Sequence, residues 1–356
     1  MKKRWVAAAV FFAAALLILI LVRCIPGFAN AFCGVAGPAV LFVVGGFFGL
    51  FPFSVVELLL YAAICLVPLT LILRLAFAKK KGILKRTAFF RWCAGICLIA
   101  SVIFLLYELG EDAHYFRMPF SVANGIGQGS YTTEELKETA ALMAARVNAE
   151  VDKVERDGDG LMQCSANVRA RCREAIGHLG ETYPQMAGFC PKPKAVLFSE
   201  LLSRAHFAGI FFACTMEANF NRDMTAYNIP ASACHELGHA KGVMMENEAN
   251  FVGYLACIDA PDADLRYSGA LMGWIYVGNE LYKRDRAAWR EIAETLDARA
   301  NKDLEANTAF WKSYESTVSA TVEKLNDGYI KSKGQAGGVE TYDRVVDLIV
   351  SYEKGR

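Results

Sequence analysis

The chain has 356 residues, of which 54% are hydrophobic and 21% are charged, and its formal net charge is +1. An ordinary soluble domain has roughly 45–50% apolar residues, and the excess here falls before residue 110, so we expect a membrane region followed by a soluble one. The balanced charge, without a basic stripe interleaved with aromatic residues, argues against a nucleic-acid partner.

Three apolar runs have the length and composition of membrane spans. They cover about residues 5–22, 58–78 and 88–107. The first run follows three basic residues, and no convincing small-residue cleavage site comes after it, so we expect a retained anchor. The lipid bilayer is thus an expected partner, contacted through three spans.

Charge in the loops predicts the orientation of these spans. Residues 79–86 contain five cations, and the amino terminus is also basic, so both are expected in the cytoplasm. The apolar segment 34–53 is broken by several Gly and Pro residues. If it crossed completely, the lysine-rich loop would move outside, so we expect an interfacial or re-entrant segment. The predicted protein is a multi-pass cell-membrane protein whose C-terminal domain lies outside the cytoplasm.

After a linker over residues 110–132, the pattern predicts one domain over residues 133–356. Its helices are expected at 134–155, 166–179, 230–242, 246–257, 270–282, 285–306, 308–326 and 342–352. Short strands are expected at 195–198 and 210–214, while Glu217-Ala218-Asn219 has the composition of a cleft-lining loop or a helix start. The fold class is therefore α+β and mostly helical, with a small sheet whose edge can align an extended peptide. The six cysteines of this domain permit disulfides, but their pairing does not follow from the sequence.

The sequence His235-Glu236-Leu237-Gly238-His239 is the most informative motif. Positions i and i+4 share one face of a helix, so His235 and His239 are predicted to bind one zinc ion per chain. Glu236 between them is the predicted catalytic residue, acting as general base toward a metal-bound water.

A catalytic zinc site keeps three protein ligands and an open position for water. The third ligand is predicted on the following helix, where Glu246 is favoured and Glu248 is the alternative. Asn250 lies on the same helix face as Glu246 and is expected to hydrogen-bond a ligand histidine without contacting the metal.

Two resemblances add to these predictions. The Glu-x-x-Ala-Asn pattern that begins at Glu246 resembles the glutamate helix of gluzincin metallopeptidases, in which the first glutamate binds zinc. The chain as a whole resembles an uncharacterised bacterial family of membrane-anchored, zincin-like proteins. That second resemblance is carried by the apolar spans and, in order, by Tyr115-Phe116-Arg117, Lys192-Pro193-Lys194, Glu217 to Asn221, Cys234-His235-Glu236, Glu246 to Leu255 and Arg266 to Gly269.

The motif and the resemblances together predict a membrane-anchored zinc metallopeptidase with a zincin-like domain that acts on peptides or proteins. Only six residues separate His239 from Glu246, fewer than in typical gluzincins, so the turn between them must be tight. His206, Tyr254 and Tyr267 are the candidate donors to the oxyanion. The alternative is a non-catalytic structural or signalling protein in which zinc only joins two helices.

Overall fold

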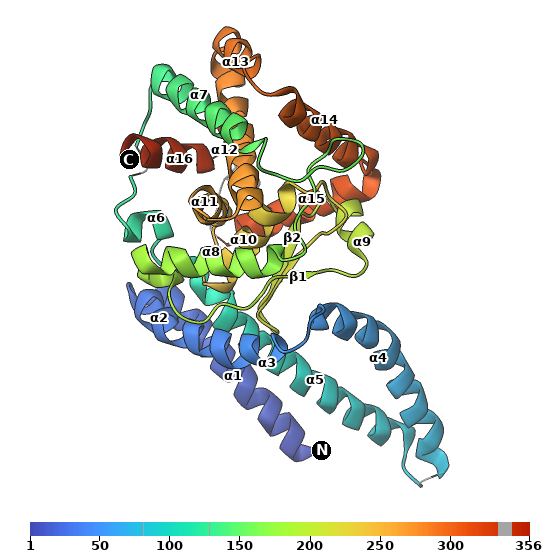
Figure 1. The fold of residues 1–356 in the computed structure, drawn as a ribbon. Coiled ribbons are helices and arrows are strands. Elements are labelled where there is room, and N and C mark those ends of the chain that lie inside the picture. The colour runs from blue at the N-terminus through green and yellow to red at the C-terminus, as the bar shows by residue number, and fades with distance from the viewer. Residues whose placement is uncertain (81, 128, 334–343) are drawn as a thin grey trace. The chain divides into compact units, whose positions relative to one another are not determined.

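The computed structural model describes all residues except 81, 128 and 334–343 (Figure 1). The chain is mostly helical, with a three-stranded sheet. Its contacts form two compact units, Met1–Arg117 with Phe212–Glu217, and Met118–Phe211 with Ala218–Arg356. We call these the membrane unit and the C-terminal unit. The expected linker 110–132 divides between the two units at Arg117.

The membrane unit contains the helices at the amino end of the chain. They are α1 (Lys2–Cys24), α2 (Phe28–Val40), the π-helical η1 (Leu41–Gly45), α3 (Gly46–Phe48), α4 (Val55–Lys80), α5 (Lys85–Gly110) and the 3-10 helix η2 (Asp112–Phe116). The three predicted spans lie within α1, α4 and α5. By length and composition a fourth helix, Phe28–Phe48, is also able to cross a membrane, so the segment expected at the interface lies largely in a further candidate span.

Helix α1 packs along α5 (Figure 1). All the buried residues of α1, Ala8, Ala15 and Val22, recur at every seventh position, and so do Ala94, Ser101 and Glu108 of α5, which also buries Ala88 and Gly110 near its ends. This spacing keeps one stripe of each helix facing a neighbour, and its mostly small side chains allow close approach of membrane helices.

Residues 212–217 form the turn end of the hairpin between β2 and β3, yet they belong to the membrane unit. The Glu217 carboxylate accepts hydrogen bonds from the backbone N–H groups of Val55, at 3.0 Å, and Val56, at 2.7 Å. These are the first residues of α4, whose terminal N–H groups have no partners within the helix. Glu217 therefore caps α4 and stabilises its positive end.

The C-terminal unit contains helices packed around a buried core. They are α6 (Phe120–Ala123), α7 (Thr133–Glu150), α8 (Val168–Thr182), the 3-10 helix η3 (Pro184–Met186), α9 (Ser199–Arg204), α10 (Asn228–Ala240), α11 (Glu246–Ile258), α12 (Ala263–Arg284), α13 (Arg286–Ala293), α14 (Ala298–Ser313), α15 (Thr317–Ser332) and α16 (Val345–Lys354). A capping box of Thr132 and Glu135 is present at the start of α7.

The predicted helix 285–306 is wrong, because two helices occupy this range. The Asp297 carboxylate accepts the backbone N–H of Arg299 and starts α14, so a capping signal overrides the continuous apolar period. Ser316 similarly starts α15 with a capping box, which divides the predicted helix 308–326. The start of the predicted helix 342–352 lies outside the described residues, and α16 forms its remainder.

The sheet consists of β1 (Lys194–Ala195), β2 (Gly209–Phe212) and β3 (Glu217–Phe220) in the order β1-β3-β2. Strands β1 and β3 are parallel, with Lys194 opposite Asn219. Two strands lie close to their predicted positions. The central strand β3 was instead expected as a loop or helix start, because its buried Glu and Asn look like surface residues when only their polarity is considered.

The core of the C-terminal unit surrounds α11, which is buried continuously from Glu248 to Ile258. Helix α10 lies against it, and glycines allow the close approach: Gly253 faces the backbone of Ala231 and His235, and Gly238 faces Val252. All eleven cysteines lie within the described part of the chain and are free thiols. The close contact between α10 and α11 determines the geometry of the predicted metal ligands.

Candidate metal centre

Helix α10 carries the two motif histidines on one face, as the i, i+4 spacing predicts. The ring centroids of His235 and His239 are 4.6 Å apart, and the rings are nearly perpendicular, at 89°. Phe211 of β2 packs against His239, with ring centroids 6.4 Å apart. The histidine pair therefore lies between α11 and the edge of the sheet.

The carboxylate of Glu246 completes a group of three side chains that could hold one metal ion. Its Oε2 lies 3.3 Å from His235 Nε2 and 3.8 Å from His239 Nε2. The three ligand atoms lie within 4.8 Å of one another. The tight turn required by the short connection forms around Gly242, whose φ of 84° is left-handed and suits glycine.

The other ring nitrogen of each histidine has an oxygen acceptor. His235 Nδ1 donates to Asn250 Oδ1, and His239 Nδ1 donates to the backbone carbonyl of Val243, each at 2.8 Å. A proton on Nδ1 leaves the lone pair on Nε2, which is the atom that faces Glu246 in both residues. These acceptors therefore hold both rings in the tautomer that a metal ligand needs.

Burial and charge affect the two imidazoles in opposite directions. For His235, burial opposes the charged form, but the hydrogen bond to Glu246 and the charges of Glu236 and Glu246 outweigh it and raise the pKa. For His239, burial and the neighbouring His235 lower the pKa to about 4, so this ring is neutral at pH 7.

Glu236 lies at the same end of α10, with only 5% of its surface exposed. Its side chain approaches Gly209, the first residue of β2. Because β2 is the outermost strand in the order β1-β3-β2, the Glu236 carboxylate lies where the motif helix meets the edge strand of the sheet.

Glu248, the alternative third ligand, lies in a different environment. It is fully buried, and its carboxylate accepts hydrogen bonds from the Ser121 backbone N–H, at 2.8 Å, and from the Ser121 hydroxyl, at 2.6 Å. Two residues along a helix correspond to a rotation of roughly 200°, so Glu246 and Glu248 face opposite sides of α11. The geometry thus favours Glu246 and gives Glu248 a structural contact with α6.

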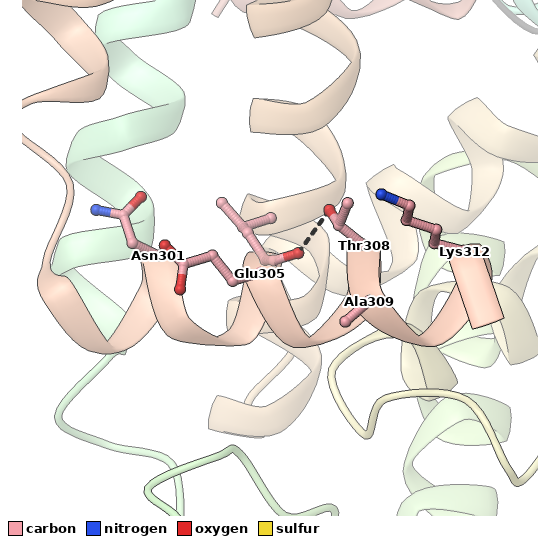
Figure 2. Close-up of a pocket in the computed structure, with 6 residues that line it drawn as sticks. Asn301, Glu305, Thr308, Ala309 and Lys312 are labelled. Atoms are coloured by element: carbon pink, nitrogen blue, oxygen red, sulfur yellow. Dashed lines mark hydrogen bonds between the residues drawn. The ribbon is translucent and has the colours of Figure 1, made fainter.

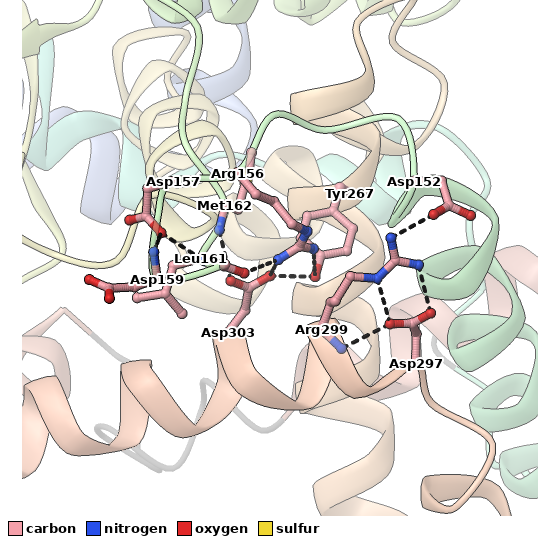
Figure 3. A network of polar contacts seen from close by, with 11 residues as sticks. Asp152, Arg156, Asp157, Asp159, Leu161, Met162, Tyr267, Asp297, Arg299 and Asp303 are labelled. Carbon is pink, nitrogen blue, oxygen red and sulfur yellow. Dashed lines mark hydrogen bonds and ion pairs between the residues drawn. The ribbon is translucent and has the colours of Figure 1, made fainter.

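Each of the three candidate oxyanion donors contacts residues that are not part of the metal cluster. The Tyr254 hydroxyl contacts Arg146 and Glu353, at 2.7 and 2.6 Å. Tyr267 donates to Asp303 at 2.6 Å, within the network of α14 and the 156–162 turn that Figure 3 shows. His206, whose φ of 58° is left-handed, packs its ring against Trp311 with centroids 5.7 Å apart. None of these contacts joins a candidate donor to the metal cluster.

A surface depression lies elsewhere, along one face of α14 (Figure 2). All of its lining residues come from this helix: Asn301, Leu304, Glu305, Thr308, Ala309 and Lys312. The Thr308 hydroxyl donates to the Leu304 carbonyl within the helix, so this polar group is already satisfied. The depression shares no residue with the metal cluster, and nothing in it indicates a ligand.

Several contacts of the site were not predicted from the sequence. The Val243 carbonyl has no side-chain signal, and Ser121 lies far from Glu248 along the chain. Gly209 could have been noticed, because a glycine inside a strand pattern often marks the close approach of another group.

Comparison with known proteins gives one family. No curated protein and no solved structure matches the sequence. A family model described as "Protein of unknown function (DUF3810)" matches residues 38–350, which is most of the chain. The chain therefore belongs to the DUF3810 family, in agreement with the expected membership of an uncharacterised family.

Proposed function

We propose that the protein is a membrane-anchored zinc metallopeptidase with a zincin-like domain. The observation that supports this proposal is the convergence of His235 Nε2, His239 Nε2 and the Glu246 carboxylate beside Glu236. Ligand atoms on a tetrahedral zinc ion, with bonds of roughly 2.0–2.1 Å, lie about 3.3 Å apart. The distances from Glu246 Oε2, 3.3 and 3.8 Å, are close to that value, so the donor set fits zinc.

Zinc bound there would lower the pKa of a water molecule and polarise a substrate carbonyl. Glu236 would accept the proton of the attacking water and return it to the leaving amine. Asn250 and the Val243 carbonyl would hold the imidazoles in orientation through their Nδ1 protons. A purely structural zinc site has no need of this glutamate and usually closes its fourth position with another protein ligand.

The position of β2 at the edge of the sheet supports a peptide as substrate. An extended peptide can pair with an exposed strand edge through its backbone, and the side chains of alternate residues then enter neighbouring pockets. Strand β2 begins beside Glu236, so a paired peptide would bring a backbone carbonyl to the general base.

Zinc content is the first test of this proposal. The purified full-length protein in detergent should bind about one zinc per chain, and the His235→Ala/His239→Ala variant should bind none, as measured by plasma mass spectrometry. The melting profile of the variant serves as a control for folding. A folded wild-type protein without affinity for zinc would exclude the metallopeptidase.

We further propose three membrane crossings, with the C-terminal unit outside the cytoplasm. The cationic loop favours this orientation, and the contacts of the helix over Phe28–Phe48 support it. Ala29 and Cys33 cluster with Val22 and Ala113, which lie at or just beyond the carboxyl ends of α1 and α5. This places the first half of the helix at one end of the α1–α5 pair.

The second half of the same helix lies at that end as well. Gly45 approaches Met216, and Met216 also approaches Gly110, the last residue of α5. A helix that crossed beside α1 and α5 would instead contact them along their length. The contacts thus favour an interfacial position for Phe28–Phe48.

Reporter fusions test this topology. A phosphatase that is active only outside the cytoplasm should be active when fused after Arg356 and inactive when fused within the 82–84 loop. A reporter that fluoresces only in the cytoplasm should give the reverse pattern and serves as the control. Four crossings from a cytoplasmic amino terminus would invert both results.

A further inference from the structure

The first residue of the edge strand, Gly209, is a glycine in a position where a strand ordinarily gains from a side chain. We propose that Gly209 is a positioning residue for Glu236, since its missing side chain leaves the space in which the Glu236 carboxylate lies. The role in hydrolysis rests on the proposed function, whereas the contact itself is testable without it.

The space beside Gly209 is already filled by its neighbours. A Cβ at this position would lie 2.6 Å from Glu236 Oε1, 2.7 Å from Glu236 Cγ and 2.8 Å from the backbone oxygen of Asn219. All three distances are shorter than ordinary contacts of a Cβ atom. The φ angle of Gly209 is not left-handed, so close approach and not backbone conformation accounts for the glycine.

The approach of Cγ matters more than that of the carboxylate oxygen. A terminal oxygen can avoid a clash by rotating about the last bonds of the side chain. The position of Cγ is set by χ1, which has only three staggered minima, so an alanine at position 209 would force Glu236 into another rotamer. That change would move the carboxylate away from its place beside the histidines.

Strand β2 cannot easily move back to make room. The Ala208 carbonyl accepts the Asn221 backbone N–H at 2.8 Å, and the Ile210 carbonyl accepts the Asn219 side-chain amide at 3.4 Å. These bonds hold the strand at the residue before Gly209 and at the residue after it. The strain of an added methyl group is therefore expected to fall on Glu236 and on the Asn219 carbonyl.

A double-mutant cycle of melting temperatures separates the contact with Glu236 from the contact with the Asn219 carbonyl. We would measure melting temperatures of the full-length protein with chelator present for wild type, Gly209→Ala, Glu236→Ala and the double variant. Gly209→Ala should lower the melting temperature by roughly 5 °C in the wild-type background. It should lower it by less than half as much in the Glu236→Ala background, because Cγ and Oε1 are then absent.

Hydrolysis supplies the second measurement. In the zinc-loaded protein, Gly209→Ala should lower kcat roughly 10²-fold, with zinc content unchanged and KM changed much less, because the general base is misplaced. Gly177→Ala is the matched control: Gly177 lies on the exposed face of α8, and no atom approaches its added Cβ within 4 Å. This control should keep full activity and an equal or higher melting temperature.

Two results would overturn the inference. An equal loss of melting temperature in both backgrounds would assign the glycine requirement to the Asn219 carbonyl alone. Full kcat in Gly209→Ala beside an active wild type would show that the Glu236 carboxylate does not depend on this space. A wild type without hydrolysis would count against the proposed function, while the melting cycle would still decide the contact.

Discussion

Replacing Glu236 with glutamine is expected to abolish hydrolysis and to leave the metal bound. Glutamine has the same shape, so the packing against Gly209 is retained, but its amide cannot accept the proton of the attacking water. Because general-base catalysis contributes roughly 10²–10⁴-fold, we expect a loss of that size in kcat on a fluorogenic peptide library.

The control for this variant is Glu291→Gln, which removes an exposed carboxylate on α13 and should change nothing. Zinc content is measured on the same samples. Unchanged turnover in Glu236→Gln would exclude this residue as the general base. Zinc retained without any wild-type hydrolysis would favour the structural role of the metal instead.

Replacing the two neighbouring glutamates of α11 with alanine is expected to affect different properties, zinc binding for Glu246 and stability for Glu248. Glu246→Ala removes the carboxylate nearest both imidazoles and should lose zinc while remaining folded. Glu248→Ala should keep the zinc site but lose stability, because the buried N–H and hydroxyl of Ser121 lose their acceptor. That loss is expected to be about 3 kcal/mol, from the two lost hydrogen bonds to the carboxylate together with the cavity left behind.

Zinc titration and urea unfolding of both variants measure these effects, and Glu248→Gln is the matched control. Glutamine retains one acceptor oxygen, so this variant should be more stable than Glu248→Ala. If a folded Glu248→Ala lost zinc while Glu246→Ala retained it, Glu248 would be the third ligand and the arrangement of α11 described here would be wrong.

Local patterns predicted much of the candidate site. The helix that carries His235 and His239, the start of the next helix at Glu246 and the proximity of Asn250 all follow from the 3.6-residue period and from short connections. These features depend on residues within about one or two helical turns of each other. A single sequence therefore suffices to locate them.

The features that were missed depend on residues far apart in the chain. Glu246 and Glu248 have similar local surroundings, and the difference between them arises from Ser121, which is 127 residues away from Glu248. Strand β3 was missed because its polar residues are buried by tertiary packing, and β1 is too short for a period of two to be recognised. The Asp297 cap is a local signal, but the apolar period continues across it and conceals the break between α13 and α14.

The position of the β2–β3 turn within the membrane unit has a consequence for biosynthesis. The helices α1 to α5 leave the ribosome long before Glu217 does, so the first N–H groups of α4 lack their carboxylate cap during insertion. The membrane unit is complete only when residues 212–217 have been translated and have folded back onto it. A fragment that ends at Arg117 would therefore lack residues 212–217, and its α4 would begin without the Glu217 cap.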